Sequence, residues 1–332
     1  MSFIEQIFGW IGTATWGWSL IPLLVVLGAF FTIASHFIQF RFFGRMFQVL
    51  YKAQPGVGQH ISSRAALLVS VGGRVGGGNI AGVAVAISLG GPGAVFWMWV
   101  IALVGMATSL IECSLAQLYK RTEEDGTYRG GPAQYILHGL GENFRWMAVV
   151  YAICLIASFA LGFNAFQGNT VAGAMEESFG IERLYTGIGF AIITALIVFG
   201  GIKRIAMAAD IVVPVMAVGY ILAALLVIIL NIASVPGVII NIVTSAFGFN
   251  EAVAGGMGAA VAQGLRRGLF SNEAGLGSAP NVAAVAYVKH PVSQGITQSL
   301  SVFIDTMIIC TATAFVILLS DAYVPGADID GV

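Results

Sequence analysis

Long apolar stretches dominate the chain and are separated by short polar connections. A helix needs about 20 apolar residues to cross the core of a bilayer. Stretches of about this length or longer predict eight crossings, at residues 20–40, 65–90, 92–119, 144–175, 184–202, 207–232, 256–287 and 296–320. They are too long and continuous for the strands of a membrane barrel, and helices satisfy their own backbone polar groups in lipid. The pattern therefore predicts an all-α polytopic membrane protein.

The composition supports this class and excludes others. Hydrophobic residues make up 58% of the chain and charged residues 9%, whereas a soluble domain averages about 25% charged residues. The net charge of −1 does not indicate a nucleic-acid partner. Catalytic motifs such as HExxH or GxSxG do not occur, so an enzyme is not expected. The three cysteines lie in apolar stretches without metal-ligand spacing and are interpreted as packing residues.

Lysine and arginine positions predict the orientation in the membrane, because basic residues concentrate in cytoplasmic connections. Eleven of them lie in alternate connections, and the opposite connections hold only Arg183. The eleven are Arg41, Arg45, Lys52, Arg64, Lys120, Arg121, Arg129, Arg145, Lys203, Arg204 and Lys289. We therefore expect a multi-pass protein of the cell inner (plasma) membrane with its amino terminus outside and its basic loops in the cytoplasm.

Residues 70–82 (SVGGRVGGGNIAG) interrupt one predicted span, since six of these thirteen residues are glycine. Each glycine costs a helix interior about 1 kcal/mol relative to alanine. Close helix packing through small residues is one interpretation, but a packing face places them every fourth residue rather than consecutively. The run favours a helix that is broken within the membrane.

Residues 264–277 (GLRRGLFSNEAGLG) interrupt a second span and carry ionisable side chains at membrane depth. Such side chains cost several kcal/mol unless they face a cavity or a partner. Arg266 and Arg267 are expected either to pair with Glu273 or Asp305 or to guard an outer vestibule. A simple loop between two short helices is the alternative, but the charge pattern requires a crossing here.

The two interruptions occupy matching places, in the first and sixth helices counted from the first break, and these helices run in opposite directions. Two discontinuous helices in inverted halves are typical of a transporter site. Freed N–H groups at a half-helix start attract a carboxylate, and freed carbonyl groups attract a cation. This pattern favours cotransport of an amino acid and a cation, with an ion channel as the alternative because broken helices also line pores.

Several motifs give the chain a family resemblance. They are residues 78–84 (GNIAGVA), 130–133 (GGPA), 270–277 (FSNEAGLG), 305–306 (DT) and 310–313 (CTAT), with Asn164, Gln167 and Asn169. On these residues the chain resembles the alanine or glycine:cation symporter family, the sodium:alanine symporters of bacteria and archaea. The chain departs from the family at Gly77, where threonine is usual, and at Val85, where threonine is frequent.

The resemblance implies the leucine-transporter-like fold, five helices repeated in inverted orientation, here with one extra N-terminal helix. It also implies sodium-coupled uptake of a small neutral amino acid, alanine or glycine, by alternating access. Sodium is then the coupling ion, and no cofactor is expected. Proton coupling or exchange is the alternative mechanism, and the oligomeric state stays open.

The implied fold divides the chain into three parts. Residues 1–64 hold the extra helix and a cytoplasmic loop, residues 65–232 form the first repeat, and residues 233–332 begin the second. Only seven core helices are counted, and Asp321–Val332 is interpreted as an outer loop. We therefore expect the natural gene to encode roughly 100 more residues, enough for the missing helices. A shorter carrier that closes its site by dimerising is the alternative.

The substrate site is expected at the two breaks. The N–H groups of Gly77, Gly78 and Asn79 would bind the substrate carboxylate. Asn164 and Gln167 share one helix face, and they either hold helices together or contact the substrate. The second break would contribute Phe270, Ser271 and Asn272. A change of Gly77→Thr, the usual family residue, is expected to be tolerated, whereas Gly78→Val is not.

By analogy with the fold, carbonyl groups near Gly72 and Val75 form half of a sodium site. Asn79, Asp305 and Thr306 are further sodium candidates. Arg74 is expected in an inner-gate ion pair. Glu112 and Asp210 are placed near cytoplasmic helix ends, where snorkelling and capping explain them.

Overall fold

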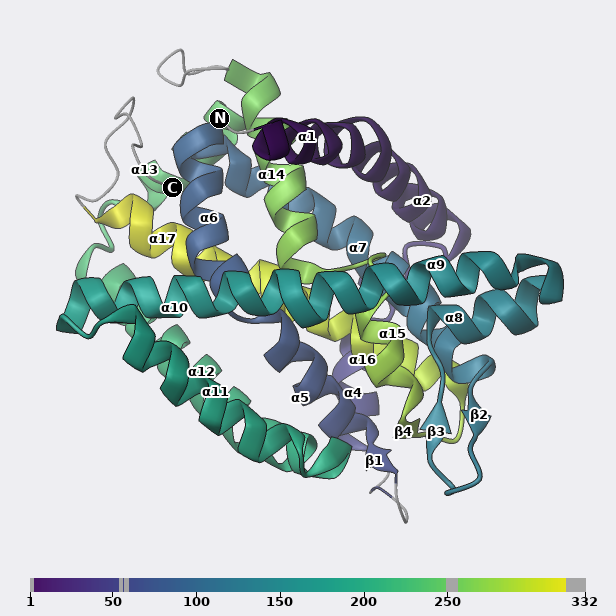
Figure 1. Cartoon of the computed structure of the whole chain (residues 1–332). Coiled ribbons are helices and arrows are strands. Elements are labelled where there is room, and N and C mark those ends of the chain that lie inside the picture. The colour runs from purple at the N-terminus through teal and green to yellow at the C-terminus, as the bar shows by residue number, and fades with distance from the viewer. Residues whose placement is uncertain (1–2, 54–55, 57–59, 249–255, 321–332) are drawn as a thin grey trace.

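The computed structural model describes residues 3–53, 56, 60–248 and 256–320 and is almost entirely helical (Figure 1). The α-helices are α1 (Phe3–Thr13), α2 (Ile21–Ala34), α3 (Ile38–Arg41), α4 (Phe43–Tyr51), α5 (Ser63–Arg74), α6 (Gly77–Gly90), α7 (Gly93–Leu118), α8 (Pro132–Tyr135), α9 (Arg145–Leu155), α10 (Asn164–Phe179), α11 (Arg183–Val198), α12 (Gly201–Leu230), α13 (Val235–Ala246), α14 (Gly256–Asn272), α15 (Ser278–Ala284), α16 (Pro291–Val302) and α17 (Thr311–Leu319). Four π-helical segments and one 3₁₀ turn connect some of them: η1 (Ala14–Leu20), η2 (Ile136–Leu140), η3 (Glu142–Phe144), η4 (Ile156–Phe163) and η5 (Phe303–Cys310). The predicted all-α polytopic class is confirmed.

Five helices within the described residues are long and apolar enough to cross a membrane. They are Gly9–Ala34, Gly93–Leu118, Glu142–Phe179, Gly201–Leu230 and Pro291–Leu319. The bent pair α5 and α6 makes a sixth. Of the other two predicted spans, Arg183–Val198 has 16 residues, and the second interruption divides α14 from α15. The predicted outer loop Asp321–Val332 lies outside the described residues.

Both interruptions are present, and both are shorter than the sequence predicts. Only Val75 and Gly76 separate α5 from α6, and the two helices are bent by 42°. Between α14 and α15 the chain leaves the helix only over residues 273–277. Arg266 and Arg267 therefore lie inside a regular helix.

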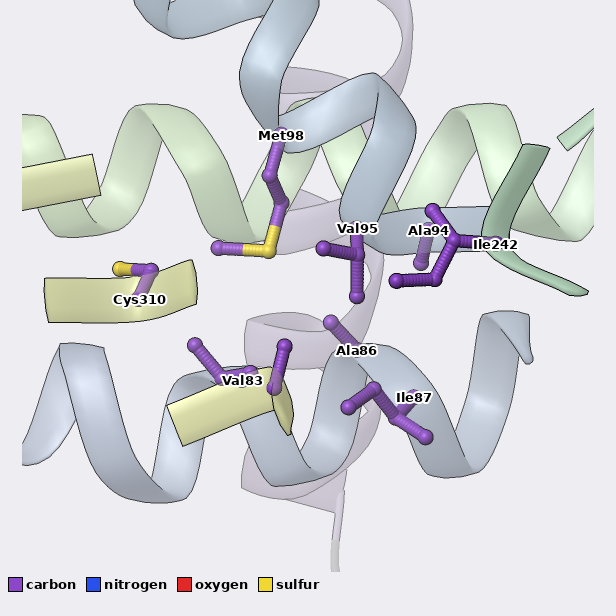
Figure 2. Packing of buried hydrophobic residues seen from close by; sticks show 9 residues of the cluster. Val83, Ala86, Ile87, Ala94, Val95, Met98, Ile242 and Cys310 are labelled. Carbon is purple, nitrogen blue, oxygen red and sulfur yellow. The ribbon is translucent and has the colours of Figure 1, made fainter. Parts of the chain in front are cut away.

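Helix α7 runs through the middle of the bundle and packs mainly against α14 and α16. One buried apolar cluster joins α7 to three other parts of the chain (Figure 2). Its labelled members are Val83, Ala86 and Ile87 from α6, Ala94, Val95 and Met98 from α7, Ile242 from α13 and Cys310 from η5. The spans predicted from the sequence leave residues 233–255 unassigned, because the 12-residue helix α13 is too short to cross a membrane.

The four short strands lie together at one end of the bundle (Figure 1). There β1 (Ile61–Ser62) pairs in parallel with β4 (Ala286–Tyr287), and Ile61 lies opposite Ala286. A second pair, β2 (Arg121–Thr122) and β3 (Tyr128–Arg129), is antiparallel. The Tyr128 ring stacks on His60 at 3.6 Å and contacts the Lys120 ammonium at 3.7 Å. Three connections far apart in sequence thus lie together, and we call them the basic cap.

We expect Gly264→Ala to destabilise the protein, because its Cβ would lie 2.4 Å from the backbone oxygen of Ala94 in α7. Overpacking of this kind costs about 1–3 kcal/mol. Gly258→Ala is the control in the same helix, since no described atom lies within 4 Å of its added Cβ. Alanine is the better helix former by about 1 kcal/mol, so this control should unfold at the same or a higher temperature in detergent. Two variants with equal unfolding temperatures would contradict the packing of α14 on α7.

Candidate functional site

Side chains replace the missing helical hydrogen bonds at the first break. The N–H of Gly76 donates to Asn79 Oδ1 at 2.8 Å, and the N–H of Gly77 donates to Gln167 Oε1 at 2.7 Å. The first N–H groups of a helix have no partner within the helix itself. Gln167 comes from α10, 90 residues further along the chain, so tertiary structure completes the start of α6.

The break also frees a backbone carbonyl group near the end of α5. Because the Gly76 N–H bonds to Asn79, the carbonyl of Gly72 loses the i+4 donor of a continuous helix. A Cβ added at Gly72 would face Val213 of α12, and Val75 packs against the apolar cluster that contains Val213. Among the described residues, no hydrogen bond links Gly72 or Val75 to the polar group around Asp305.

Five buried residues form a polar group between the two breaks, which we call the Asp305 cluster. They are Asn79, Ser271, Asp305, Thr306 and Cys310. Asn79 Nδ2 donates to Asp305 Oδ1 at 2.7 Å and to Ser271 Oγ at 3.0 Å. The hydroxyl groups of Ser271 and Thr306 both donate to Asp305 Oδ2 at 2.9 Å. One fully buried carboxylate thus accepts from three different helical segments.

The position of Asp305 depends on the π-helical segment η5 within the long helix Pro291–Leu319. A π-helical turn changes the direction of the side chains that follow it, and such turns are frequent at functional sites. Cys310, at the end of η5, lies 3.2 Å from both Ser271 Oγ and Asn79 Nδ2. The sequence indicated a packing role for this cysteine, and the structure adds a polar one.

The second break is held by side chains from elsewhere in the chain. Three of its residues have positive φ angles: Glu273 (53°), Gly275 (86°) and Gly277 (87°). Glu112 Oε1 accepts the N–H of Gly275 at 3.3 Å, and the Tyr151 hydroxyl donates to the carbonyl of Gly277 at 2.8 Å. Glu112 is 7% exposed, so the sequence-based interpretation of a snorkelling residue was wrong. Its partner, 163 residues away, could not be identified from the sequence.

Four aromatic rings follow one another beside the first break. Phe166 meets Phe270 edge-on at 5.4 Å, Phe270 stacks on Phe163 at 5.1 Å, and Phe163 stacks on Phe159 at 4.5 Å. We call them the aromatic row. Three come from η4 and α10, and Phe270 comes from α14. Offset and edge-to-face ring pairs add about 0.5–1.5 kcal/mol each beyond the burial of their area.

A cavity of about 560 Å³ lies on one side of the aromatic row. Its lining includes Phe166, Thr170, Glu177, Arg183 and Arg267. Glu177 and Arg183 belong to the connection that the charge pattern places outside. Arg267 therefore lies in this cavity, which we call the outer cavity because the charge pattern predicts that side to be outside. Arg266 is directed at the Trp16 ring, 5.9 Å away. Neither arginine forms an ion pair with Glu273 or Asp305 among the described residues.

Most, but not all, of the predicted substrate residues come together. The structure places Gly77, Gly78, Asn79, Gln167, Phe270 and Ser271 around the first break. Asn164 is exposed and donates to the carbonyl of Ala160 in its own helix, although it lies only one turn from Gln167. Asn272 accepts the N–H of Ala274 and lies near Gly105 of α7, so it shapes the second break instead.

The two glycines at the start of α6 differ in the space beside them. A Cβ at Gly77 would lie 2.8 Å from the Phe166 ring, whereas at Gly78 its nearest neighbour, Ser271 Cα, is 3.5 Å away. Gly77 is thus the more crowded position in this conformation. The expectation that Gly77→Thr is tolerated better than Gly78→Val rests on the family resemblance and on carboxylate binding, and it stays a prediction.

Comparisons with known proteins identify relatives along the whole chain. The model of the "Sodium:alanine symporter family" matches residues 1–332. The chain is 54% identical over 301 residues to "Amino-acid carrier protein AlsT" of Bacillus subtilis, covering 90% of this chain and 64% of that protein. It is 48% identical over 321 residues to "Probable sodium/glutamine symporter GlnT" of the same organism, covering 96% and 66%. It is also 39% identical over 325 residues to "Sodium/alanine symporter AgcS" of Methanococcus maripaludis, covering 96% and 71%. The chain thus spans about two thirds of the length of these curated relatives.

The hydrogen bond of Glu112 can be tested with two substitutions that differ only in the acceptor. Glu112→Leu leaves the Gly275 N–H without its acceptor and should lower the free energy of unfolding by about 1–3 kcal/mol. Glu112→Gln keeps a carbonyl oxygen and removes a buried charge, so its stability should equal or exceed that of the natural protein. Thermal unfolding in detergent measures both. Equal losses in the two variants would mean that the carboxylate charge, not the hydrogen bond, matters.

Proposed function

The chain belongs to the sodium:alanine symporter family, and on this premise we propose that it takes up a small neutral amino acid, alanine or glycine, together with a sodium ion. The observation that carries the proposal is the junction of two ligand types at one break. The N–H groups at the start of α6 suit a carboxylate. The oxygen-rich Asp305 cluster lies directly behind them, joined through Asn79.

The substrate carboxylate binds at the N–H of Gly77, where Gln167 Oε1 lies in the present structure. A carboxylate is the stronger acceptor, because charge-assisted hydrogen bonds are about twice as strong as neutral ones. The displaced amide oxygen of Gln167 is then free to accept from the substrate ammonium group. Gln167 thus exchanges one backbone donor for one substrate donor, and no polar group is left without a partner.

Sodium binds at the Asp305 cluster, where Ser271, Asp305 and Thr306 supply oxygen atoms. In broken-helix transporters such oxygens replace the hydration shell of the ion. Asn79 at present directs its amide nitrogen at the carboxylate. Turning this amide would direct its oxygen at the ion and withdraw it from the Gly76 N–H. Ion binding would thereby free a second backbone donor for the substrate, which couples the two ligands.

The position of the aromatic row supports alternating access. The outer cavity ends at Phe166, and Phe270 stands beside the break, near Gly78. The rings of the aromatic row must move apart before a substrate passes from the outer cavity towards the cytoplasm. The two broken helices then belong to inverted repeats that begin near residues 65 and 233, with the amino terminus outside.

The Phe270 ring limits the size of the substrate. It contacts the rings of Phe163 and Phe166 and lies next to Gly78. There is therefore little room beside the break for a substrate with a long side chain. This favours alanine and glycine over glutamine, which the name of one relative mentions. Competition of unlabelled alanine, glycine and glutamine with labelled alanine uptake identifies the preferred substrate. The same uptake measured with and without sodium, at two proton gradients, identifies the coupling ion.

Gln167→Ala should weaken amino-acid binding about tenfold or more, because a hydrogen bond to a charged group contributes about 1.5–3 kcal/mol. Asn164→Ala is the control one turn away, where the amide bonds only to its own helix. That variant should bind within about twofold of the natural protein. Equilibrium binding of labelled alanine measures both, and equal affinities for the two variants would remove Gln167 from the site.

Asp305→Asn should raise the sodium concentration for half-maximal alanine binding about tenfold, corresponding to about 1.4 kcal/mol. The amide keeps an acceptor for Asn79 and loses the charge that attracts the ion. Asp210→Asn, on an exposed position of α12, is the control and should leave the sodium dependence unchanged. An unchanged sodium curve in a folded Asp305→Asn protein would place the ion elsewhere.

A further inference from the structure

A second cavity, of about 280 Å³, lies at the other end of the aromatic row. Phe159 lines it, whereas Phe166 lines the outer cavity, and Phe163 and Phe270 stand between them. Its polar lining consists of Ser70, Arg74, Glu273, Ser278 and Asn281. These residues belong to α5, the second break and α15. Since β1 leads into α5 and β4 follows α15, this inner cavity lies on the side of the basic cap.

Arg74 brings unused donors to the inner cavity. Its side chain is buried, with 3% exposure, and Nη1 donates to Ser301 Oγ. Its Nε and Nη2 atoms are buried without a hydrogen-bond partner among the described residues, and so is the hydroxyl of Ser70 one turn earlier. Buried polar groups are nearly always hydrogen-bonded, and each exception calls for an explanation. A ligand with acceptor oxygens would satisfy all three.

Glu273 brings the opposite charge to the same cavity. It is 5% exposed, its backbone has a φ angle of 53°, and its carboxylate accepts from the Ser278 hydroxyl. The expected inner-gate ion pair of Arg74 is not found: no described carboxylate lies within 4 Å of its side chain. A guanidinium and a carboxylate therefore line one small cavity without pairing.

We propose that the inner cavity is a second amino-acid site, which holds the substrate zwitterion after it has left the first break for the cytoplasm. The proposal rests on the proposed function. Arg74 and Ser70 bind the substrate carboxylate, since a guanidinium matches a carboxylate with two parallel hydrogen bonds. Glu273 accepts from the substrate ammonium group. A zwitterion is the ligand that satisfies both charges at once, whereas a lone anion or cation satisfies one of them.

The order of the sites along the path follows from the covalent structure. Arg74 ends α5 and Gly77 begins α6, so Arg74 directly precedes the two residues of the first break. Glu273 lies two residues after Ser271 of the Asp305 cluster. Both breaks thus present one binding group to the first site and one to the inner cavity. A substrate that passes the aromatic row meets matching charges before it reaches the cytoplasm.

The test is sided transport kinetics in proteoliposomes of known protein orientation, with labelled alanine as the probe. Half-saturating alanine concentrations are measured separately at the outer and at the cytoplasmic face. Arg74→Gln and Glu273→Gln should each raise the cytoplasmic value about tenfold or more and leave the outer value within about twofold. The double variant should resemble either single variant, because both groups hold one ligand. Arg267→Gln removes a guanidinium from the outer cavity and should leave the cytoplasmic value within about twofold.

Ser70→Ala is a milder variant that keeps the proposal testable if a charge substitution prevents folding. It should raise the cytoplasmic value about threefold. The inner site would be disproved if the half-saturating alanine concentration rose equally at both faces, or if the cytoplasmic value stayed normal in folded variants. Either result would leave the proposed symporter function intact. A natural protein that shows no saturable amino-acid transport from either face would overturn both.

Discussion

The structure depends on one constraint: a helix that breaks inside a membrane must find partners for the backbone groups it releases. Asn79 and Gln167 accept the freed N–H groups at the first break, and Glu112 accepts one at the second. Each partner comes from a side chain rather than from the backbone of a neighbouring segment. Side chains can move away without unfolding a helix, so the same groups can be handed to a ligand.

Buried charged side chains lie close to the two breaks. Glu112, Glu273 and Asp305 are at most 7% exposed, and Arg74 is the buried cation nearest to them among the described residues. Ionisable groups inside a membrane are costly and mark the path of ions or substrates. An excess of acidic over basic groups in the interior favours a cation as one of the ligands. The amino acid that we propose as the substrate is a zwitterion and would add no net charge to this interior.

The rings of the aromatic row lie between the two cavities. The aromatic row reaches from the outer cavity to the inner one, and Phe270 links the row to the second broken helix. Phe163 belongs to the π-helical segment η4, and Asp305 belongs to η5. Phe270 and Ser271 are neighbours in α14, so this helix joins the aromatic row to the Asp305 cluster.

The sequence by itself determined the membrane class, the two interruptions and the family. These features follow from local composition: apolar length, consecutive glycines and charge counts are properties of single segments. Only the tertiary structure decided which polar residues meet. Gln167 reaches the first break and Asn164 does not, although both lie on one helix, because only one of them faces α6. Glu112 and Arg74 owe their roles to partners more than 150 residues away. Hydrogen bonds over such distances depend on how the helices pack, and no local pattern encodes that.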